Sequence, residues 1–145
     1  VFIVEFYCTV NLVSDPPDGD WLHVGDSAFT MSSSAFSWYD ANMYCQSIGS
    51  HLATLLSENE FVFTSLLIEQ KFFYVTKFWI GGNDESAEGV WTWSNGDPWS
   101  FSGFTHNEPN GGFWENCLEL RNINSQLYWN DVGCNTVQHA LCQKM

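Results

Sequence analysis

The hydrophobic pattern of the chain predicts an α+β fold with an antiparallel sheet. Two segments in the first half carry apolar residues at helical spacing, and five short aromatic or β-branched runs follow them. Because helices come first and mostly strands follow, this order disfavours a parallel βαβ array. A length of 145 residues suits one domain with its own hydrophobic core.

Residues 1–20 are expected to form an N-terminal extension. Residues 1–13 are apolar and suit a first strand or the remnant of a signal peptide, and the strand is favoured. This segment includes Glu5 and is too short for a transmembrane helix. The prolines, aspartates and glycine of Asp15–Asp20 predict a turn that separates the extension from the rest.

The first helix is predicted within Ser34–Gly49. This segment carries four apolar residues at i, i+3, i+4 and i+7 spacing: Ala41, Tyr44, Cys45 and Ile48. Gly49 is a suitable C-terminal cap because glycine readily adopts a positive φ. The spacing therefore turns Cys45 toward the core.

The second helix is predicted to begin at Ser57 and to continue to about Gln70. Ser57 followed by Glu60 is a capping-box pattern. A short apolar run, His51–Leu56, precedes it. The buried side of the helix is expected to include Phe63, Leu66, Leu67 and Gln70.

Five later runs suit strands because they are short and rich in aromatic and β-branched residues. They are Phe78–Ile80, Val90–Trp93, Cys117–Leu120, Leu127–Trp129 and Ala140–Cys142.

A long loop is predicted between Trp93 and Cys117, because this segment has neither hydrophobic period. Its aromatic residues argue against disorder: Trp99, Phe101, Phe104, Phe113 and Trp114. Packing is the more frequent role of such side chains, and stacking on a ligand is the other. Ordering a loop costs about 1 to 2 kcal/mol per residue, so a bound cation would help to hold it.

Oxygen ligands for such a cation cluster near the end of the loop. Glu108, Asn110 and Glu115 fall close together, and Asn130 and Asp131 follow in a predicted strand end. Calcium accepts about six to eight oxygen ligands in tolerant geometry, whereas magnesium requires a near-ideal octahedron. Calcium is therefore the better candidate, although these residue types are also ordinary in loops.

The charge balance excludes several partners. Seventeen acidic residues against four basic ones give a formal net charge of -13. Nucleic acids and anionic membranes are disfavoured, because their recognition requires clustered Lys and Arg. Solubility and metal binding explain the acidity about equally well.

Five cysteines are present without a C-x-x-C pair or a nearby histidine at zinc-ligand spacing, which argues against a zinc module. Four can form two bridges, so an oxidising, extracellular compartment is expected for a secreted protein.

Taken together, the motifs resemble those of the C-type lectin domain family. They are WIGG at Trp79–Gly82, EPN at Glu108–Asn110, ENC at Glu115–Cys117, WND at Trp129–Asp131 and the final C-x7-C at Cys134–Cys142. The similarity covers residues 21–145 and is specific as an ordered combination. It implies two helices packed on antiparallel sheets, with a long calcium-binding loop region.

The resemblance also implies a site. The family pattern places calcium on Glu108, Asn110, Glu115, Asn130 and Asp131, where two vicinal sugar hydroxyls complete the shell of the ion. The EPN order resembles members that bind mannose, fucose and N-acetylglucosamine, whereas galactose-type members carry QPD. A cis peptide is implied before Pro109.

Two disulfides, Cys45–Cys142 and Cys117–Cys134, follow from the same resemblance. Cys8 then remains, either as a link between two chains or as a free buried thiol.

The chain also departs from the family pattern. Asp84 and Glu88 match an auxiliary calcium site, but Gly111 and Asn116 stand where acidic residues are common. The resemblance therefore supports this second site only in part, through Asp84, Glu88 and Asn116.

An enzyme is not expected, because the sequence has no G-x-S-x-G, Walker, G-x-G-x-x-G or H-E-x-x-H motif. The main alternative to sugar binding is a module of the same fold that recognises a protein or an ice surface.

Overall fold

A computed structural model describes residues 21–104, 108–124 and 126–145. The predicted extension, its turn and Cys8 lie outside the described residues.

Within this part of the chain, eight strands form one sheet in the order β1-β2-β8-β4-β6-β7, with β3 beside β8 and β5 beside β4. Their bounds are β1 Leu22–Val24, β2 Ser27–Phe36, β3 His51–Leu52, β4 Lys77–Asn83, β5 Thr92–Trp93, β6 Cys117–Ile123, β7 Gln126–Val132 and β8 Gln138–Lys144. All pairings between these strands are antiparallel except that of β4 with β8. The α+β prediction is confirmed, and the parallel pair makes the sheet mixed.

Helix α1 (Trp38–Ser47) lies within the predicted segment and begins after β2, which continues through Phe36. Ser37 caps it by accepting from the Asp40 N–H. Ala41, Cys45 and Ile48 are fully buried, as predicted. Gly49, at φ +77°, ends the helix, and the next N–H, that of Ser50, donates to the Cys45 carbonyl at 2.9 Å.

Helix α2 (Glu58–Lys71) has its predicted cap, since the Ser57 hydroxyl accepts from the Glu60 N–H. Its predicted buried side is wrong for three of the four residues: Phe63 and Leu66 are 55% and 51% exposed, and Gln70 is exposed as well. Thr64 and Ile68 are buried instead, and Phe61 and Leu67 are partly buried. The helix has apolar residues on several of its faces, so their spacing alone did not identify the buried face.

Strands β1 and β2 were not predicted. The sequence of β2, SAFTMSSSAF, is rich in serine and has few of the β-branched residues that signal strands. Pairing with β8 fixes its conformation, for example Thr30 opposite Cys142.

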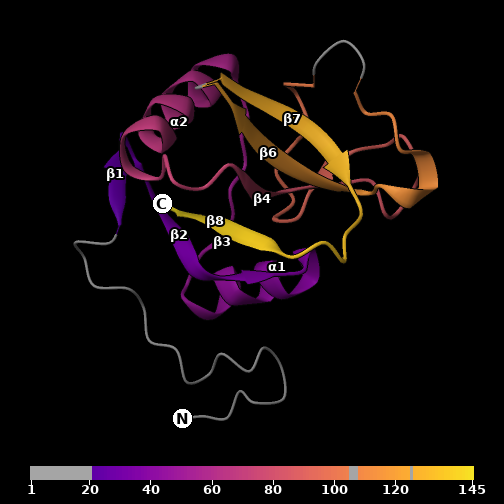
Figure 1. Cartoon of the computed structure of the whole chain (residues 1–145), viewed down its shortest axis with the longest axis horizontal. Coiled ribbons are helices and arrows are strands. Elements are labelled where there is room, and N and C mark those ends of the chain that lie inside the picture. Colours follow the sequence, from indigo (N-terminus) through magenta and orange to yellow (C-terminus); the bar gives the residue numbers. More distant parts are fainter. Residues whose placement is uncertain (1–20, 105–107, 125) are drawn as a thin grey trace.

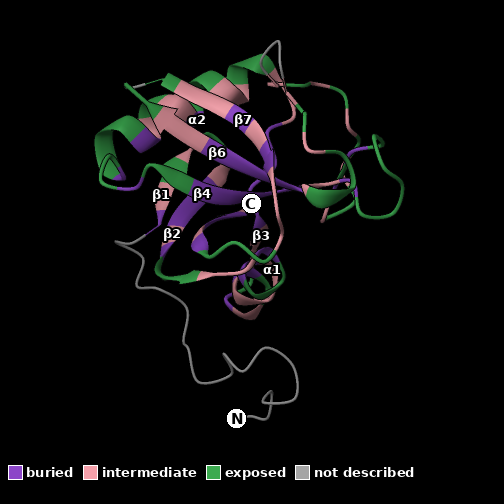
Figure 2. Cartoon of the chain, turned by 45° about the vertical axis from the view of Figure 1, so that its right-hand side comes forward, coloured by how far each residue is buried: buried purple, intermediate pink, exposed green. Residues whose placement is uncertain are grey.

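The two helices cover separate hydrophobic clusters. One contains Ile68 of α2 together with Trp129, and the other contains Ala41 and Cys45 of α1. Figure 1 shows α2 above and α1 below the strands, and Figure 2 shows buried strands between the two helices. No helix of the described chain is long and apolar enough to cross a membrane.

Both predicted disulfides are present in the described part of the chain. Cys45–Cys142 joins α1 to β8, and Cys117–Cys134 joins the start of β6 to the segment after β7. The second bridge therefore fixes the chain beside the long loop.

Candidate functional site

The first half of the long loop, residues 94–104, packs around Trp129. This indole is fully buried. Four rings lie with centroids 5.5 to 5.7 Å from the Trp129 ring: Trp93, Trp99, Phe101 and Phe104. Trp129 therefore has a packing role, and aromatic contacts stabilise this half of the loop.

Gly103 allows this close packing. A Cβ at Gly103 would lie 2.7 Å from the Trp129 indole, closer than real Cβ contacts. The backbone of the loop therefore lies directly on the ring.

The second half of the loop, residues 108–116, closes on the end of β7. Asp131 is 1% exposed, and its two oxygens accept from the backbone N–H groups of Asn110 and Gly111 at 3.1 and 2.8 Å. The Glu108–Pro109 peptide is cis, as the resemblance implied. This arrangement brings the EPN segment against the WND strand end.

Glu115 lies directly on Gly111. A short 3-10 turn, η4 (Gly112–Trp114), separates these two residues. A Cβ at Gly111 would lie 2.1 Å from Glu115 Oε1 and 2.3 Å from the Glu115 Cβ. The absence of a side chain at Gly111 therefore makes room for Glu115, which explains a glycine where the family often has an acid.

The carboxylates of this half repel one another. Burial, followed by the nearby Asp131 carboxylate and Glu115, raises the pKa of Glu108, and Arg121 partly offsets the increase. Burial and then Asp131 and Glu119 raise the pKa of Glu115. Glu108 Oε1 is buried and has no hydrogen-bond partner among the described residues. Unpartnered buried oxygens and converging negative charge fit a cation.

The side chain of Asn130 is oriented by Glu119, a residue that the sequence analysis did not identify. Asn130 Nδ2 donates to Glu119 Oε2 at 2.8 Å, so the amide oxygen of Asn130 is free to act as a ligand. Glu119 is 2% exposed and lies opposite Asn130 in the β6–β7 register. Only this register identifies the contact, and no local motif signals it.

The predicted auxiliary residues also meet near the Cys117 end of the loop. Asp84 Oδ2 accepts from the Gly89 N–H at 2.8 Å, and the Asp84 N–H donates to the Asn116 carbonyl. Among the described residues, Asp84 Oδ1 and Asn116 Oδ1 are buried without a hydrogen-bond partner. Glu88 is exposed, and desolvation and the nearby Asp84 raise its pKa. These groups could hold a second cation.

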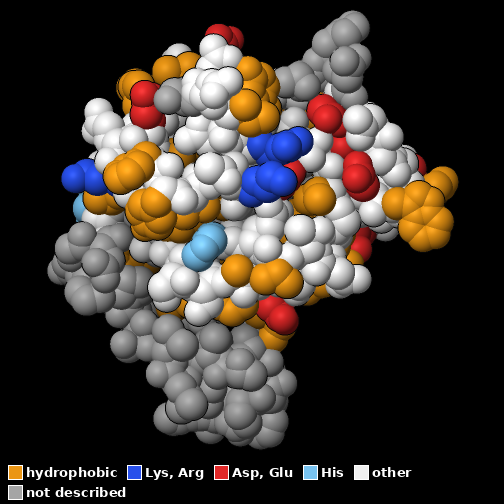
Figure 3. Space-filling model, viewed as in Figure 1, with side chains coloured by type: hydrophobic (Ala, Val, Ile, Leu, Met, Phe, Trp, Pro, Cys, Tyr) orange, Lys and Arg blue, Asp and Glu red, His pale blue; other side chains and the backbone are white. Residues whose placement is uncertain are grey.

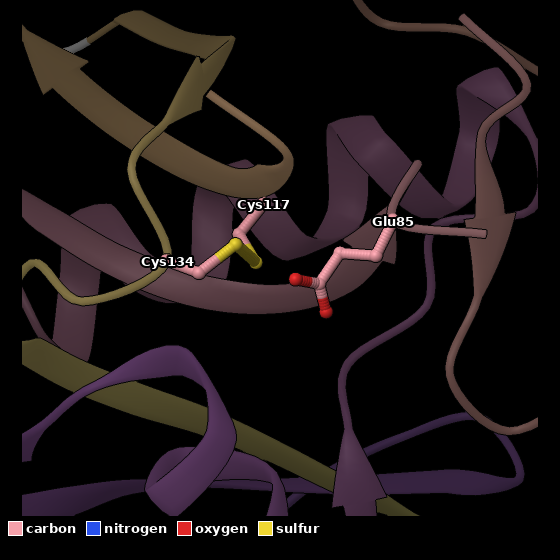
Figure 4. Close-up of side chains that lie close together, drawn as sticks. All are labelled: Glu85, Cys117 and Cys134. Carbon is pink, nitrogen blue, oxygen red and sulfur yellow. A yellow bond between two sulfur atoms is a disulfide. The ribbon is translucent and has the colours of Figure 1, made fainter. Parts of the chain in front are cut away.

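A third group of possible ligand types is not a metal site. Glu85 lies beside Cys117 and Cys134, but the two sulfurs are bonded to each other (Figure 4). The Tyr39 hydroxyl donates to Glu85, and this bond raises the pKa of Tyr39 to about 12.

Two aromatic side chains of the second half of the loop are exposed. Phe113 and Trp114 are 76% and 87% exposed, so the packing role expected for loop aromatics is wrong for these two. It is right for Trp99, which packs on Trp93. Figure 3 shows basic side chains near the middle of one face, acidic ones beside them and a hydrophobic tip at the right-hand edge.

Comparison with known proteins identifies the class. The model of the lectin C-type domain matches residues 34–144. Lectin BRA-3 of Megabalanus rosa is 31% identical over 147 residues, covering 99% of this chain and 86% of that protein. The chain therefore belongs to the C-type lectin domain family, whose members are non-enzymatic carbohydrate-binding or recognition modules.

Other relatives differ in the ligand or role that their names give. The galactose-specific lectin nattectin of Thalassophryne nattereri is 31% identical over 137 residues, covering 94% of this chain and 84% of that protein. The structure of a Ca2+-dependent type II antifreeze protein in its Ca2+-free form aligns with a TM-score of 0.77 at 25% identity, covering 90% of this chain and 100% of that chain.

Proposed function

We propose that this domain binds mannose-type sugars, including mannose, fucose and N-acetylglucosamine, through a calcium ion held by Glu108, Asn110, Glu115, Asn130 and Asp131. The observation that carries the proposal is the convergence of three carboxylates on one loop end, with the buried Glu108 Oε1 unpartnered among the described residues. Family membership supports a sugar as the ligand.

The side chains around the ion have complementary roles toward a sugar. Calcium, when bound, supplies positions for two vicinal hydroxyl oxygens. Ionised Glu108 and Glu115 can only accept hydrogen bonds, so a sugar hydroxyl would donate its O–H to each. The amides of Asn110 and Asn130 can donate to hydroxyl lone pairs, and Glu119 fixes the orientation of the Asn130 amide.

The order of acid and amide in the EPN segment supports the mannose-type preference. Relatives of similar identity include one named as galactose-specific, so overall similarity does not select the sugar. The choice therefore falls to the residues that contact the hydroxyls, and these are Glu108 and Asn110.

An auxiliary cation at Asp84, Glu88 and Asn116 is part of the same proposal. Two buried oxygens there have no partner among the described residues, and a cation would satisfy both. The two disulfides support an extracellular location, because such bridges persist in oxidising compartments.

Retention on immobilised mannose and on immobilised galactose tests the proposal, with calcium present and then with a chelator. Mannose retention that the chelator releases is the expected result. The double variant Glu108→Gln, Asn110→Asp, which creates the opposite order of acid and amide, should shift retention toward galactose. Stronger retention of the unaltered chain on galactose would contradict the preference.

Recognition of a protein or an ice surface is the alternative, since an antifreeze protein shares the fold. Ice-recrystallisation inhibition by the purified domain, together with no retention on either sugar, would favour that alternative.

A further inference from the structure

A cavity of about 760 Å³ lies apart from the candidate calcium site. Its lining comes from the turn between β1 and β2, from β3 and the segment after it, from α2, from the start of the long loop and from the end of β8. The lining shares no described residue with the proposed calcium ligands. The volume falls within the range of small-molecule sites, about 300 to 1,000 Å³. The cavity is therefore a candidate for a separate binding site.

Two buried polar side chains give the cavity a fixed polar lining. Thr54 and Gln143 are 2% and 6% exposed. The Thr54 N–H donates to Gln143 Oε1 at 2.9 Å, and Gln143 Nε2 donates to Ser27 Oγ at 3.0 Å. These bonds join the segment after β3 to β8 and β2, so the fold holds this part of the lining in place.

A third buried polar side chain lacks a partner of this kind. Thr64 of α2 is 2% exposed and lines the cavity. The hydroxyl of its neighbour Ser65 donates to the Phe61 carbonyl, whereas the Thr64 hydroxyl has no hydrogen-bond partner among the described residues. An unpartnered buried hydroxyl is unfavourable, and a ligand in the cavity would satisfy it.

The other polar groups of the lining leave acceptors free. Asn95 Nδ2 donates to Asp97 Oδ2 at 2.9 Å, and Glu60 Oε1 accepts from a backbone N–H at 3.1 Å. The second oxygen of each carboxylate has no hydrogen-bond partner within the described chain, and Asp26 has none either. His51 Nδ1 donates to a backbone carbonyl, so Nε2 of the neutral ring is a further acceptor. Since the lining contains no Lys or Arg, it favours a ligand with donors and positive charge.

Apolar side chains complete the lining. Phe29 is 4% exposed and Leu56 is half-buried. Phe63 lies on α2 with 55% of its surface exposed, although the helical spacing predicted that it would be buried. An apolar ligand body in the cavity would cover part of this exposed ring, which is favourable in water.

We propose that this cavity binds a small amphiphilic amine, with its protonated nitrogen at the carboxylates and its apolar body against Phe29, Leu56 and Phe63. An ammonium group carries three N–H donors and the charge that the lining lacks. An anion would meet three carboxylates, and a neutral alcohol would not balance their charge. The inference does not depend on the proposed sugar site, because the two sites share no described residue.

Two-dimensional NMR of the isotope-labelled domain tests the proposal with three probes of similar shape: the cationic tryptamine, the neutral tryptophol and the anionic indoleacetate. Tryptamine should bind about tenfold more tightly than tryptophol, the effect of one hydrogen bond to a charged group, and indoleacetate should not bind. The amide shifts that change should include those of Val24–Ser27, Thr64 and Asn95–Asp97. Added salt should weaken tryptamine binding, because salt screens the attraction between charges.

Glu60→Gln and Asp97→Asn should each weaken tryptamine binding about tenfold, because each removes a charge and keeps an oxygen for the existing hydrogen bond. Glu69→Gln is the matched control, because Glu69 is exposed on the same helix and does not line the cavity. Phe63→Ala should also weaken binding and Leu66→Ala should not. These two side chains are 55% and 51% exposed on α2, but only Phe63 lines the cavity.

Several results would overturn the inference. Tryptophol or indoleacetate binding as tightly as tryptamine would reject the requirement for positive charge. Shift changes centred on Asn110–Glu115 would place the amine at the candidate calcium site. Absence of tryptamine binding, or an equal loss in Glu69→Gln, would reject the cavity as its site. Thermal unfolding of each variant shows whether a loss of binding reflects unfolding, and the two lining carboxylates test the charge requirement independently.

Discussion

The two halves of the long loop are held by different forces. Residues 94–104 pack around the buried ring of Trp129. Residues 108–116 close on Asp131 through two backbone N–H groups and bring acidic side chains together. Aromatic packing does not depend on pH or on a cation, whereas a cluster of carboxylates depends on both.

This difference indicates which half serves recognition. Buried carboxylates that repel one another lower stability unless a partner neutralises them. The second half therefore has the properties of a ligand site, and the first half has those of its scaffold. Substitutions in one half of the loop, with measurements of stability and of calcium binding, therefore test whether the two halves are independent.

The largest effect is expected from Trp129→Ala. Removal of this ring leaves five aromatic neighbours without their common contact, and a change of this kind typically costs about 3 to 5 kcal/mol. Urea unfolding should show a similar loss in calcium and in calcium-free buffer. A loss of stability confined to the calcium-loaded domain would show that the two halves of the loop are not stabilised independently.

The next effect is the stabilisation by calcium and its loss in acid. Calcium at about 100 times its Kd should raise the free energy of unfolding by about 2.7 kcal/mol at neutral pH. The raised pKa values of Glu108 and Glu115 mean that the metal-free native state binds protons more tightly than the unfolded chain does.

The stabilising contribution of these two groups to the metal-free protein is therefore full below the ordinary carboxyl pKa. It is lost as the pH rises through their raised native values. Calcium reverses this trend because it requires the ionised form. Thermal unfolding of calcium-stripped protein, with and without added calcium, checks this. Calcium should raise the unfolding temperature strongly at pH 7.5 and little at about pH 4, near the ordinary carboxyl pKa values.

Glu115→Gln is the matched control for this experiment, because it removes one titrating ligand and keeps the shape of the side chain. Its calcium increment should be smaller at pH 7.5. An equal increment at both pH values in the unaltered domain would exclude carboxylate ligands.

A smaller effect is expected from Gly111→Ala. The added Cβ would overlap Glu115, so the carboxylate must move. Calcium affinity should fall about tenfold, equivalent to 1.4 kcal/mol. Calorimetric titration with calcium measures the change, and metal-free stability reports any general damage. Unchanged calcium affinity would place Glu115 outside the site.

Trp114→Ala should have the smallest effect on stability, within about 0.5 kcal/mol, because the ring is 87% exposed. Urea unfolding checks this directly. A loss comparable to that of Trp129→Ala would contradict the description of Trp114 as an exposed side chain.

Local sequence signals predicted the elements whose boundaries depend on local chemistry. The Ser57 cap, the Gly49 terminus and the buried Cys45 all follow from side chains within a few residues of one another. Each of the five predicted runs contributes to an observed strand. The disulfides and the cis peptide before Pro109 came from the family resemblance and not from local chemistry.

Contacts between distant segments account for what sequence reasoning missed. Strand β2 lacks a strand-like composition and depends on its pairing with β8. The buried face of α2 was misplaced because the helix has apolar residues on several sides. The exposure of Trp114 and the partial burial of Trp99 likewise depend on how the loop folds over β7.

The sequence by itself determined the α+β class, the end of α1 at Gly49, the start of α2 at Ser57 and the residues with oxygen ligands that are proposed to hold calcium. Residue type and near-neighbour spacing contain that information. Only the tertiary structure decided that Trp129 anchors one half of the loop, that Glu115 occupies the space beside Gly111, and that Glu119 faces Asn130. These contacts join residues through strand register and loop closure, which no local pattern specifies.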